Sequence, residues 1–348
     1  MFVYSDGGVG ASDICVSMTV NSVRKIMVQL QSPSSSSGRL GDHHVPVEIT
    51  TAEEIISGKL SNECCLLIMP GGRDLPYVDK LQGEGNKNIS DFVRNGGSYL
   101  GICAGAYYGC SLVQFAQGDP LLEVVGPREL SFFPGISRGP VYKGFDYTTN
   151  EGAKAADIQL TPSGIELLKF YAENKAVKST PQLQCSNNVD NYFKTTSLPS
   201  GGGEIDSFMK IYYNGGCHFV DNLHTDRDNE MLQEFTLLSK PPYSLPMRTS
   251  PYKVLATYAT PTDAGCLSRF VSVQGATQPP LSAIVAGHYG KGRVVLSGVH
   301  FEASSELLRR HYKGDPYIES LQTHIADSDA ARERLLSACV RHLLNCDE

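Results

Sequence analysis

The sequence has little of what marks a nucleic-acid-binding or membrane-spanning protein. Its 348 residues carry 30 Lys and Arg against 37 Asp and Glu, a net charge of -7, so no basic stripe is available for a phosphate backbone. No apolar run approaches the ~18 residues that a membrane span needs, and the first residues lack the basic and apolar segments of a signal peptide. We therefore expect a globular, cytoplasmic protein with neither nucleic acid nor membrane as a partner.

The sequence also lacks the cysteine spacing of a metal site. Ten cysteines are present, but they form no C-x-x-C pair, and no histidine stands at zinc-finger spacing. We expect reduced, mostly buried thiols, with no bound metal and no cofactor. The glycines at 7–10 are not followed by the Gly-Lys-Ser/Thr of a phosphate loop, so a tight turn is preferred there.

Apolar runs alternate with amphipathic segments along much of the chain. The pattern predicts strands at 2–4, 45–49, 65–69, 99–102, 252–258, 282–288 and 293–299, helices from 12 and 52, and two helices within 315–346. Near-continuous apolar strands that alternate with helices are typical of an α/β protein with a doubly wound, mostly parallel sheet covered on both faces. Ligands of such sheets bind beyond the carboxyl ends of the strands.

We expect a single domain over 1–348 with two inserted segments. These lie at about 184–203 and 221–251, where Pro, Gly and polar residues interrupt the apolar pattern. The loop at 186–203 is long enough to serve as a lid, and the sequence leaves that question open.

A lone cysteine ends the apolar part of YLGICAGAY, residues 99–107. Cys103 stands between Gly101 and Gly105, where a predicted strand meets a predicted helix. This G-x-C-x-G pattern is the cysteine form of a nucleophile elbow, a sharp turn that exposes its central side chain. A helix N-terminus favours the thiolate and can hold an oxyanion. The alternative is an inert thiol packed in the core.

A histidine and a carboxylate two residues apart follow the last apolar strand. In the sequence GVHFE, an extended chain places the side chains of His300 and Glu302 on the same side. The carboxylate can then orient the imidazole while the other ring nitrogen faces Cys103. The alternative for His300 is a structural histidine at a strand end. Taken together, the three residues predict a catalytic site at one edge of the sheet.

Two other motifs are interpreted as structural. Cys217 and His218 are adjacent, and neighbours on a strand point to opposite faces, so they do not form a thiolate–imidazole pair. The sequence GKGR at 290–293 has no helix after it, and we expect it to turn one strand into the next.

Several longer segments resemble a known family. They are MPGGRDLPY (69–77), GGSYLGICAGAYYG (96–109), FFPGISRGPVYKGF (132–145) and YYNGG (212–216). Together they resemble the N-terminal domain of eukaryotic biotin-protein ligases and, more broadly, the class I glutamine amidotransferase superfamily. The resemblance implies a flavodoxin-like sheet, with Cys103 as nucleophile, His300 as base and Glu302 as the group that orients the base.

The resemblance also implies an oxyanion hole and sets limits on the function. Backbone N–H groups of Gly72 and Ala104 would form the hole, and Gly71 would keep its turn tight. Two features depart from the pattern: the usual H-P-E of the superfamily has Phe301 at its centre here, and no G-R-G-R-type biotinyl-adenylate loop is present. We therefore do not expect this chain to be a complete biotin ligase.

Two classes of function follow from these residues. In the first, Cys103 attacks the carbonyl of a small amide or ester, for which the resemblance implies glutamine, and the thioester is hydrolysed or passed to an amine. In the second, the chain is a non-catalytic binding or regulatory module associated with biotin-protein ligation. Its partner would be a biotin ligase or synthetase acting in trans. A purely structural role is a third alternative.

Overall fold

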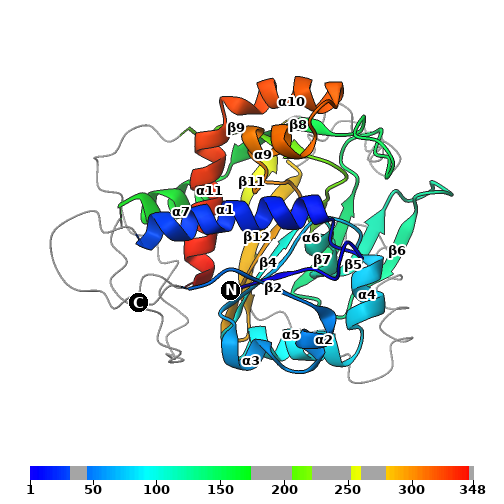
Figure 1. Ribbon diagram of the computed structural model, residues 1–348, viewed down its shortest axis with the longest axis vertical. Coiled ribbons are helices and arrows are strands. Elements are labelled where there is room, and N and C mark those ends of the chain that lie inside the picture. The colour runs from blue at the N-terminus through cyan, green and yellow to red at the C-terminus, as the bar shows by residue number, and fades with distance from the viewer. Residues whose placement is uncertain (32–44, 174–205, 222–251, 260–279, 345–348) are drawn as a thin grey trace.

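The computed structural model describes most of the chain (Figure 1). The described residues are 1–31, 45–173, 206–221, 252–259 and 280–344. The loop at 186–203 and all but the first residue of the segment 221–251 lie outside the described residues, as does the predicted insertion at 184–203.

The described strands form one 13-stranded sheet, and half of its main path is parallel. In the order β2-β1-β3-β4-β13, five neighbouring strands pair in parallel: β2 (Glu48–Thr50), β1 (Phe2–Tyr4), β3 (Leu66–Met69), β4 (Ser98–Ile102) and β13 (Gly292–Ser297). The residues of β1, β3, β4 and β13 are buried, which explains their continuous apolar sequences. The expected α/β fold is confirmed.

Mostly antiparallel strands extend the sheet beyond β13. They are β12 (Ser282–Tyr289), β10 (His218–Val220), β7 (Phe133–Gly139), β5 (Cys110–Phe115) and β6 (Val124–Pro127), with β11 (Lys253–Tyr258), β8 (Lys154–Leu160) and β9 (Phe208–Tyr213) branching from β12. Only β5 and β7 pair in parallel within this part. The segment GKGR joins β12 to β13 as a hairpin turn, as predicted.

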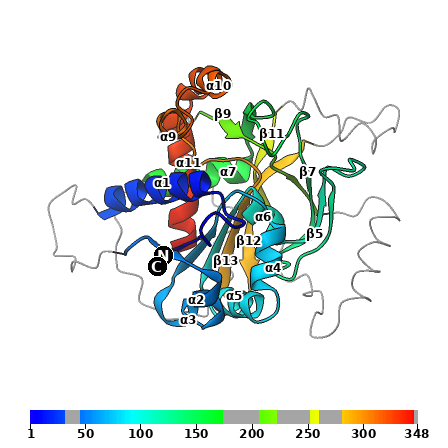
Figure 2. The same ribbon diagram turned by 45° about the vertical axis from the view of Figure 1, so that its right-hand side comes forward.

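Helices cover the parallel strands on both sides (Figure 2). One layer holds α1 (Asp13–Gln31), α7 (Pro162–Glu173) and α11 (Asp329–Leu344), and the other holds α2 (Ala52–Ile56), α3 (Leu60–Glu63), α4 (Leu75–Leu81), α5 (Glu84–Arg94) and α6 (Ala104–Tyr108). In α5, for example, the apolar face of Ile89, Phe92 and Val93 is buried, as helical spacing requires.

Two further helices lie beside the antiparallel strands. These are α9 (Ser305–His311) and α10 (Pro316–Ala326), which pack on each other, and α10 also contacts β8 and β9. α10 and α11 occupy the range where the sequence predicts two C-terminal helices. No helix among the described residues combines the length and the apolarity that crossing a bilayer demands.

Candidate functional site

Cys103 occupies a strained turn between β4 and α6. Its φ of 49° and ψ of -106° are unusual for a residue with a side chain, and such a conformation costs about 1–3 kcal/mol. The backbone N–H of Cys103 donates to the carbonyl of Ser297, the last residue of β13, across 2.8 Å. The predicted elbow is therefore present, and it is fixed to the strand that leads to His300.

Close packing around this turn requires glycine on both sides of the cysteine. A Cβ on Gly101 would lie 2.4 Å from the carbonyl oxygen of Gly105. A Cβ on Gly105 would lie 2.0 Å from the carbonyl oxygen of Met69 at the end of β3. The two glycines thus let α6 approach β3 and β4, and this contact sets where the thiol stands.

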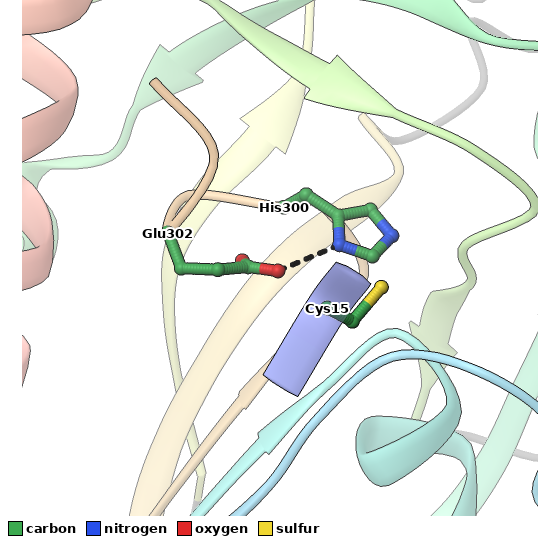
Figure 3. Close-up of side chains that lie close together, drawn as sticks. All are labelled: Cys15, His300 and Glu302. Carbon is green, nitrogen blue, oxygen red and sulfur yellow. Dashed lines mark hydrogen bonds and ion pairs between the residues drawn. The ribbon is translucent and has the colours of Figure 1, made fainter. Parts of the chain in front are cut away.

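His300 and Glu302 form a buried pair at the end of β13 (Figure 3). Nδ1 of His300 lies 2.8 Å from Oε1 of Glu302, and the two residues are 3% and 0% exposed. The predicted pairing is present, but the extended geometry from which it was predicted is wrong. A turn brings the side chains together, in which the N–H of Ala303 donates to the carbonyl of His300 across 3.0 Å.

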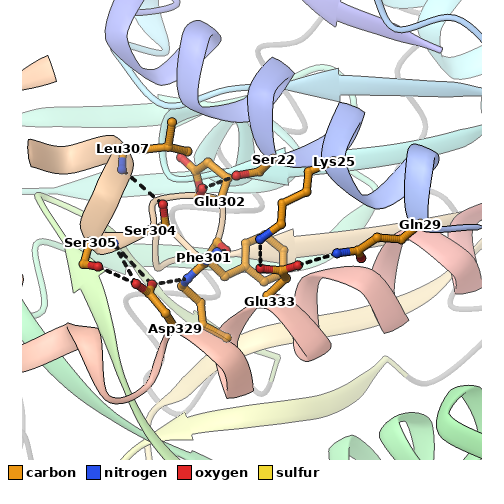
Figure 4. Close-up of polar contacts among 11 residues, drawn as sticks. Ser22, Lys25, Gln29, Phe301, Glu302, Ser304, Ser305, Leu307, Asp329 and Glu333 are labelled. Atoms are coloured by element: carbon orange, nitrogen blue, oxygen red, sulfur yellow. Dashed lines mark hydrogen bonds and ion pairs between the residues drawn. The ribbon is translucent and has the colours of Figure 1, made fainter. Parts of the chain in front are cut away.

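Contacts from α1 and α11 hold this turn in place (Figure 4). The hydroxyl of Ser22 on α1 donates to the carbonyl of Glu302 across 2.6 Å. The guanidinium of Arg332 on α11 donates to the carbonyl of Phe301 across 2.5 Å. Because both contacts bind backbone oxygens, they fix the path of the chain and so the position of the Glu302 carboxylate.

Gly71 lies where the side chains of the site converge. A Cβ built on Gly71 would stand 2.6 Å from Cε1 of His300 and 3.5 Å from Cβ of Cys103. It would also stand 3.0 Å from Sγ of Cys15. The turn after β3 therefore separates the imidazole from the cysteine by no more than the width of a glycine, and any larger residue would push them apart.

The surroundings of His300 favour its protonated form. Burial by itself lowers the pKa of the imidazole, but the Glu302 carboxylate and then Cys103, as a charge and as a side-chain hydrogen-bond partner, raise it. The net result is a pKa well above the usual value. An imidazolium beside a thiol can stabilise the thiolate and later return a proton to a leaving group.

A small hollow of about 360 Å³ opens in front of Cys103. The thiol is 6% exposed, and its sulfur lies 3.5 Å from the carbonyl oxygen of Asn214. Gly72 and Ala104 line the same hollow. Within the described part of the chain, the backbone N–H groups of these two residues form no hydrogen bond, so both are available to a ligand.

Cys15 is part of this cluster and was missed by the sequence analysis. Its sulfur and ligand atoms of His300 and Glu302 lie within 4.8 Å of one another, and burial raises the pKa of its thiol to about 12. Cys, His and Glu can bind a metal, but Nδ1 of His300 already donates to Glu302 here. The only sequence signal for Cys15 is its place in the first turns after β1, next to β3.

Cys217 and His218 lie apart from this pair as buried structural residues. Burial, with the nearby charge of Arg138, lowers the pKa of His218 to about 3, so the ring is neutral. Burial raises the pKa of the Cys217 thiol well above its usual value. Neither residue has the properties of a reactive group.

The geometry can now be compared with known proteins. The family described as biotin-protein ligase, N terminal, matches residues 2–179 and 186–347. The chain belongs to this family. The biotin-protein ligase of Schizosaccharomyces pombe is 37% identical over 151 residues, which are 43% of this chain and 22% of that protein.

Other similar proteins are less informative about activity. A protein of Chlamydia muridarum, described as uncharacterized, is 47% identical over 97 residues, 28% of this chain and 37% of its own length. Each of these two matches thus spans well under half of the relative. Among solved structures, a GMP synthase-like protein from Thermoplasma acidophilum has 13% identity and a TM-score of 0.39 over 99% of this chain and 96% of its own, a likeness on which no conclusion rests.

Proposed function

We propose that this protein is a cysteine-dependent hydrolase or acyl transferase that acts on a small amide or ester. The observation that most directly supports this is the strained Cys103 turn next to the buried His300–Glu302 pair. Backbone strain of this kind persists where the surrounding structure enforces it, and it concentrates at functional sites. A cytoplasmic location, where thiols stay reduced, suits the same chemistry.

In the proposed reaction, Cys103 forms and releases a thioester. Its thiolate attacks the carbonyl carbon, the C–S bond forms, and the C–N or C–O bond to the leaving group breaks. His300 gives its proton to the departing amine or alcohol while Glu302 holds the ring. Water or an acceptor amine, deprotonated by His300, then attacks the thioester and returns Cys103 to the free thiol.

The developing oxyanion would bind at the turn that follows β3. Gly72 and Ala104 each offer a backbone N–H on the hollow beside Cys103. Gly71 has no side chain to occupy the space between them and His300. Donors that are fixed before the reaction typically contribute about 3–4 kcal/mol to the transition state.

An activated ester provides the first test. Incubation with p-nitrophenyl acetate is expected to give a burst of p-nitrophenolate, with the acetyl group on the Cys103 peptide by mass spectrometry. Cys103→Ser is expected to abolish both signals. Cys217→Ser, which changes another buried cysteine, is expected to keep both. Acetylation spread over several thiols without a burst would contradict the proposal.

A second function, a regulatory module, is favoured by membership of the family. Under this alternative the chain binds a biotin ligase or synthetase in trans and needs no turnover. The rate of biotin transfer by a purified ligase would then change when the chain is added, and Cys103→Ser would act as well as the wild type. An effect that depends on Cys103 would favour the enzyme.

A further inference from the structure

The hollow in front of Cys103 has one aromatic side. Tyr107, Phe115, Phe145 and Tyr147 line it. The rings of Phe145 and Tyr147 stand edge to face with centroids 4.8 Å apart, and Phe145 packs in the same way on Phe115 at 5.3 Å. Edge-to-face contacts fix the orientation of the rings. This side is therefore a preformed surface for a planar or apolar group.

The rim of the hollow carries a fixed cation. The guanidinium carbon of Arg73 lies 4.2 Å from the centre of the Tyr147 ring. Among the residues that the structure describes, Arg73 has no carboxylate within ion-pair distance. A guanidinium that is held by stacking keeps its fork of donors free for a carboxylate.

The carboxylate that lines the hollow is already paired. Oδ2 of Asp74 lies 2.6 Å from one terminal nitrogen of Arg128 and 2.8 Å from its Nε. The two side chains are 13% and 4% exposed, so solvent screens this pair little. Asp74 is therefore not available to bind the ammonium group of a substrate, and the remaining charge at the rim is that of Arg73.

We propose that the hollow binds an acyl compound with a planar or apolar body, a carboxylate and no ammonium group. This inference rests on the function proposed above. The carboxylate would pair with Arg73 and the body would pack on Phe145 and Tyr147, which leaves the carbonyl at Cys103. Glutamine fits less well, because its ammonium group finds no free carboxylate among the described lining residues. The volume of about 360 Å³ is that of a small-molecule site.

Three chloroacetamides that differ only in these features test the inference. They are p-(chloroacetamido)benzoate, the neutral chloroacetanilide and chloroacetamide, each with its Cys103 alkylation rate divided by its rate with glutathione. The normalised rates are expected to fall in that order. Arg73→Gln is expected to reduce the benzoate rate by about fivefold and to leave the chloroacetanilide rate unchanged. Tyr147→Leu is expected to reduce both aryl rates.

Arg94→Gln is the matched control, because Arg94 also stacks on a tyrosine, Tyr289, at 5.5 Å. Its rates are expected to equal those of the wild type. Free benzoate is expected to slow alkylation of Cys103 by chloroacetamide more than free glutamine does. Equal normalised rates for the three reagents, or better protection by glutamine, would overturn the inference alone. Absence of Cys103 alkylation by all three would overturn the proposed function and this inference with it.

Discussion

The imidazole of His300 and the carboxylate of Glu302 meet at 2.8 Å inside the protein, where both residues are almost inaccessible to solvent. Such a pair sets both the orientation and the charge of the ring. Removing one partner of a buried pair leaves the other uncompensated, so changes here affect reactivity more than changes at the surface do.

Glu302→Gln is expected to lower the pKa of His300. The amide keeps a hydrogen-bond acceptor but loses the charge that raises this pKa, so less imidazolium remains to stabilise the Cys103 thiolate. Alkylation of Cys103 at about pH 6 is expected to slow about tenfold, which corresponds to one pKa unit. Glu306→Gln, at an exposed ion pair, is the control. A pH profile that overlays the wild type would show that Glu302 does not tune the site.

Gly71→Ala is expected to separate Cys103 from His300. The added methyl group would lie 2.6 Å from Cε1 of the imidazole, which real contacts do not tolerate. We expect a folded protein whose Cys103 alkylation below about pH 7 is at least tenfold slower. In the control Gly126→Ala, the new methyl group would meet its nearest atom at 3.7 Å, and no loss of reactivity is expected. Unchanged alkylation in both variants would contradict the arrangement.

Cys15 is expected to stay unreactive although it lies beside the site. With a pKa of about 12, only about one molecule in ten thousand carries a Cys15 thiolate at about pH 8. Peptide mapping after limiting iodoacetamide is expected to find Cys103 modified and Cys15 intact. Cys15→Ala should keep Cys103 alkylation within the same order of magnitude. Preferential labelling of Cys15 would mean that it is the nucleophile.

His218 is expected to make the fold sensitive to acid. Its folded pKa of about 3 lies below the ~6.5 of an unfolded histidine, so the unfolded chain binds more protons as the pH falls. Stability is therefore lost from about pH 6.5 towards about pH 3, with a slope of up to about 1.4 kcal/mol per pH unit from this residue. Denaturant titrations of the wild type and His218→Asn measure the difference, and parallel curves would refute it.

The sequence predicts the parallel part of the fold well because burial leaves a local signal there. Strands such as β3, which are buried on both faces, are continuously apolar. β5, β6 and β7 were not anticipated, since polar residues, Gly and Pro break their pattern. α9 was also missed: it has only seven residues, and its start depends on the cap in which Ser304 accepts a hydrogen bond from the N–H of Leu307.

The site shows the same division between local and distant information. The strained turn at Cys103 and the contact of His300 with Glu302 follow from short motifs, and both are present. Cys15 and Arg73 join the site from separate parts of the chain, and only the packing of α1 and of the turn after β3 places them there. Spacing within the sequence carries no record of such contacts.

The most direct test of the account is the rate of Cys103 alkylation by limiting iodoacetamide from about pH 5 to about pH 8. The account predicts that Cys103 reacts at the acidic end, well ahead of every other thiol, and that His300→Ala removes this advantage. If Cys103 reacts no faster than the remaining thiols at about pH 5, or if His300→Ala leaves its rate unchanged, Cys103 and His300 do not form a catalytic pair.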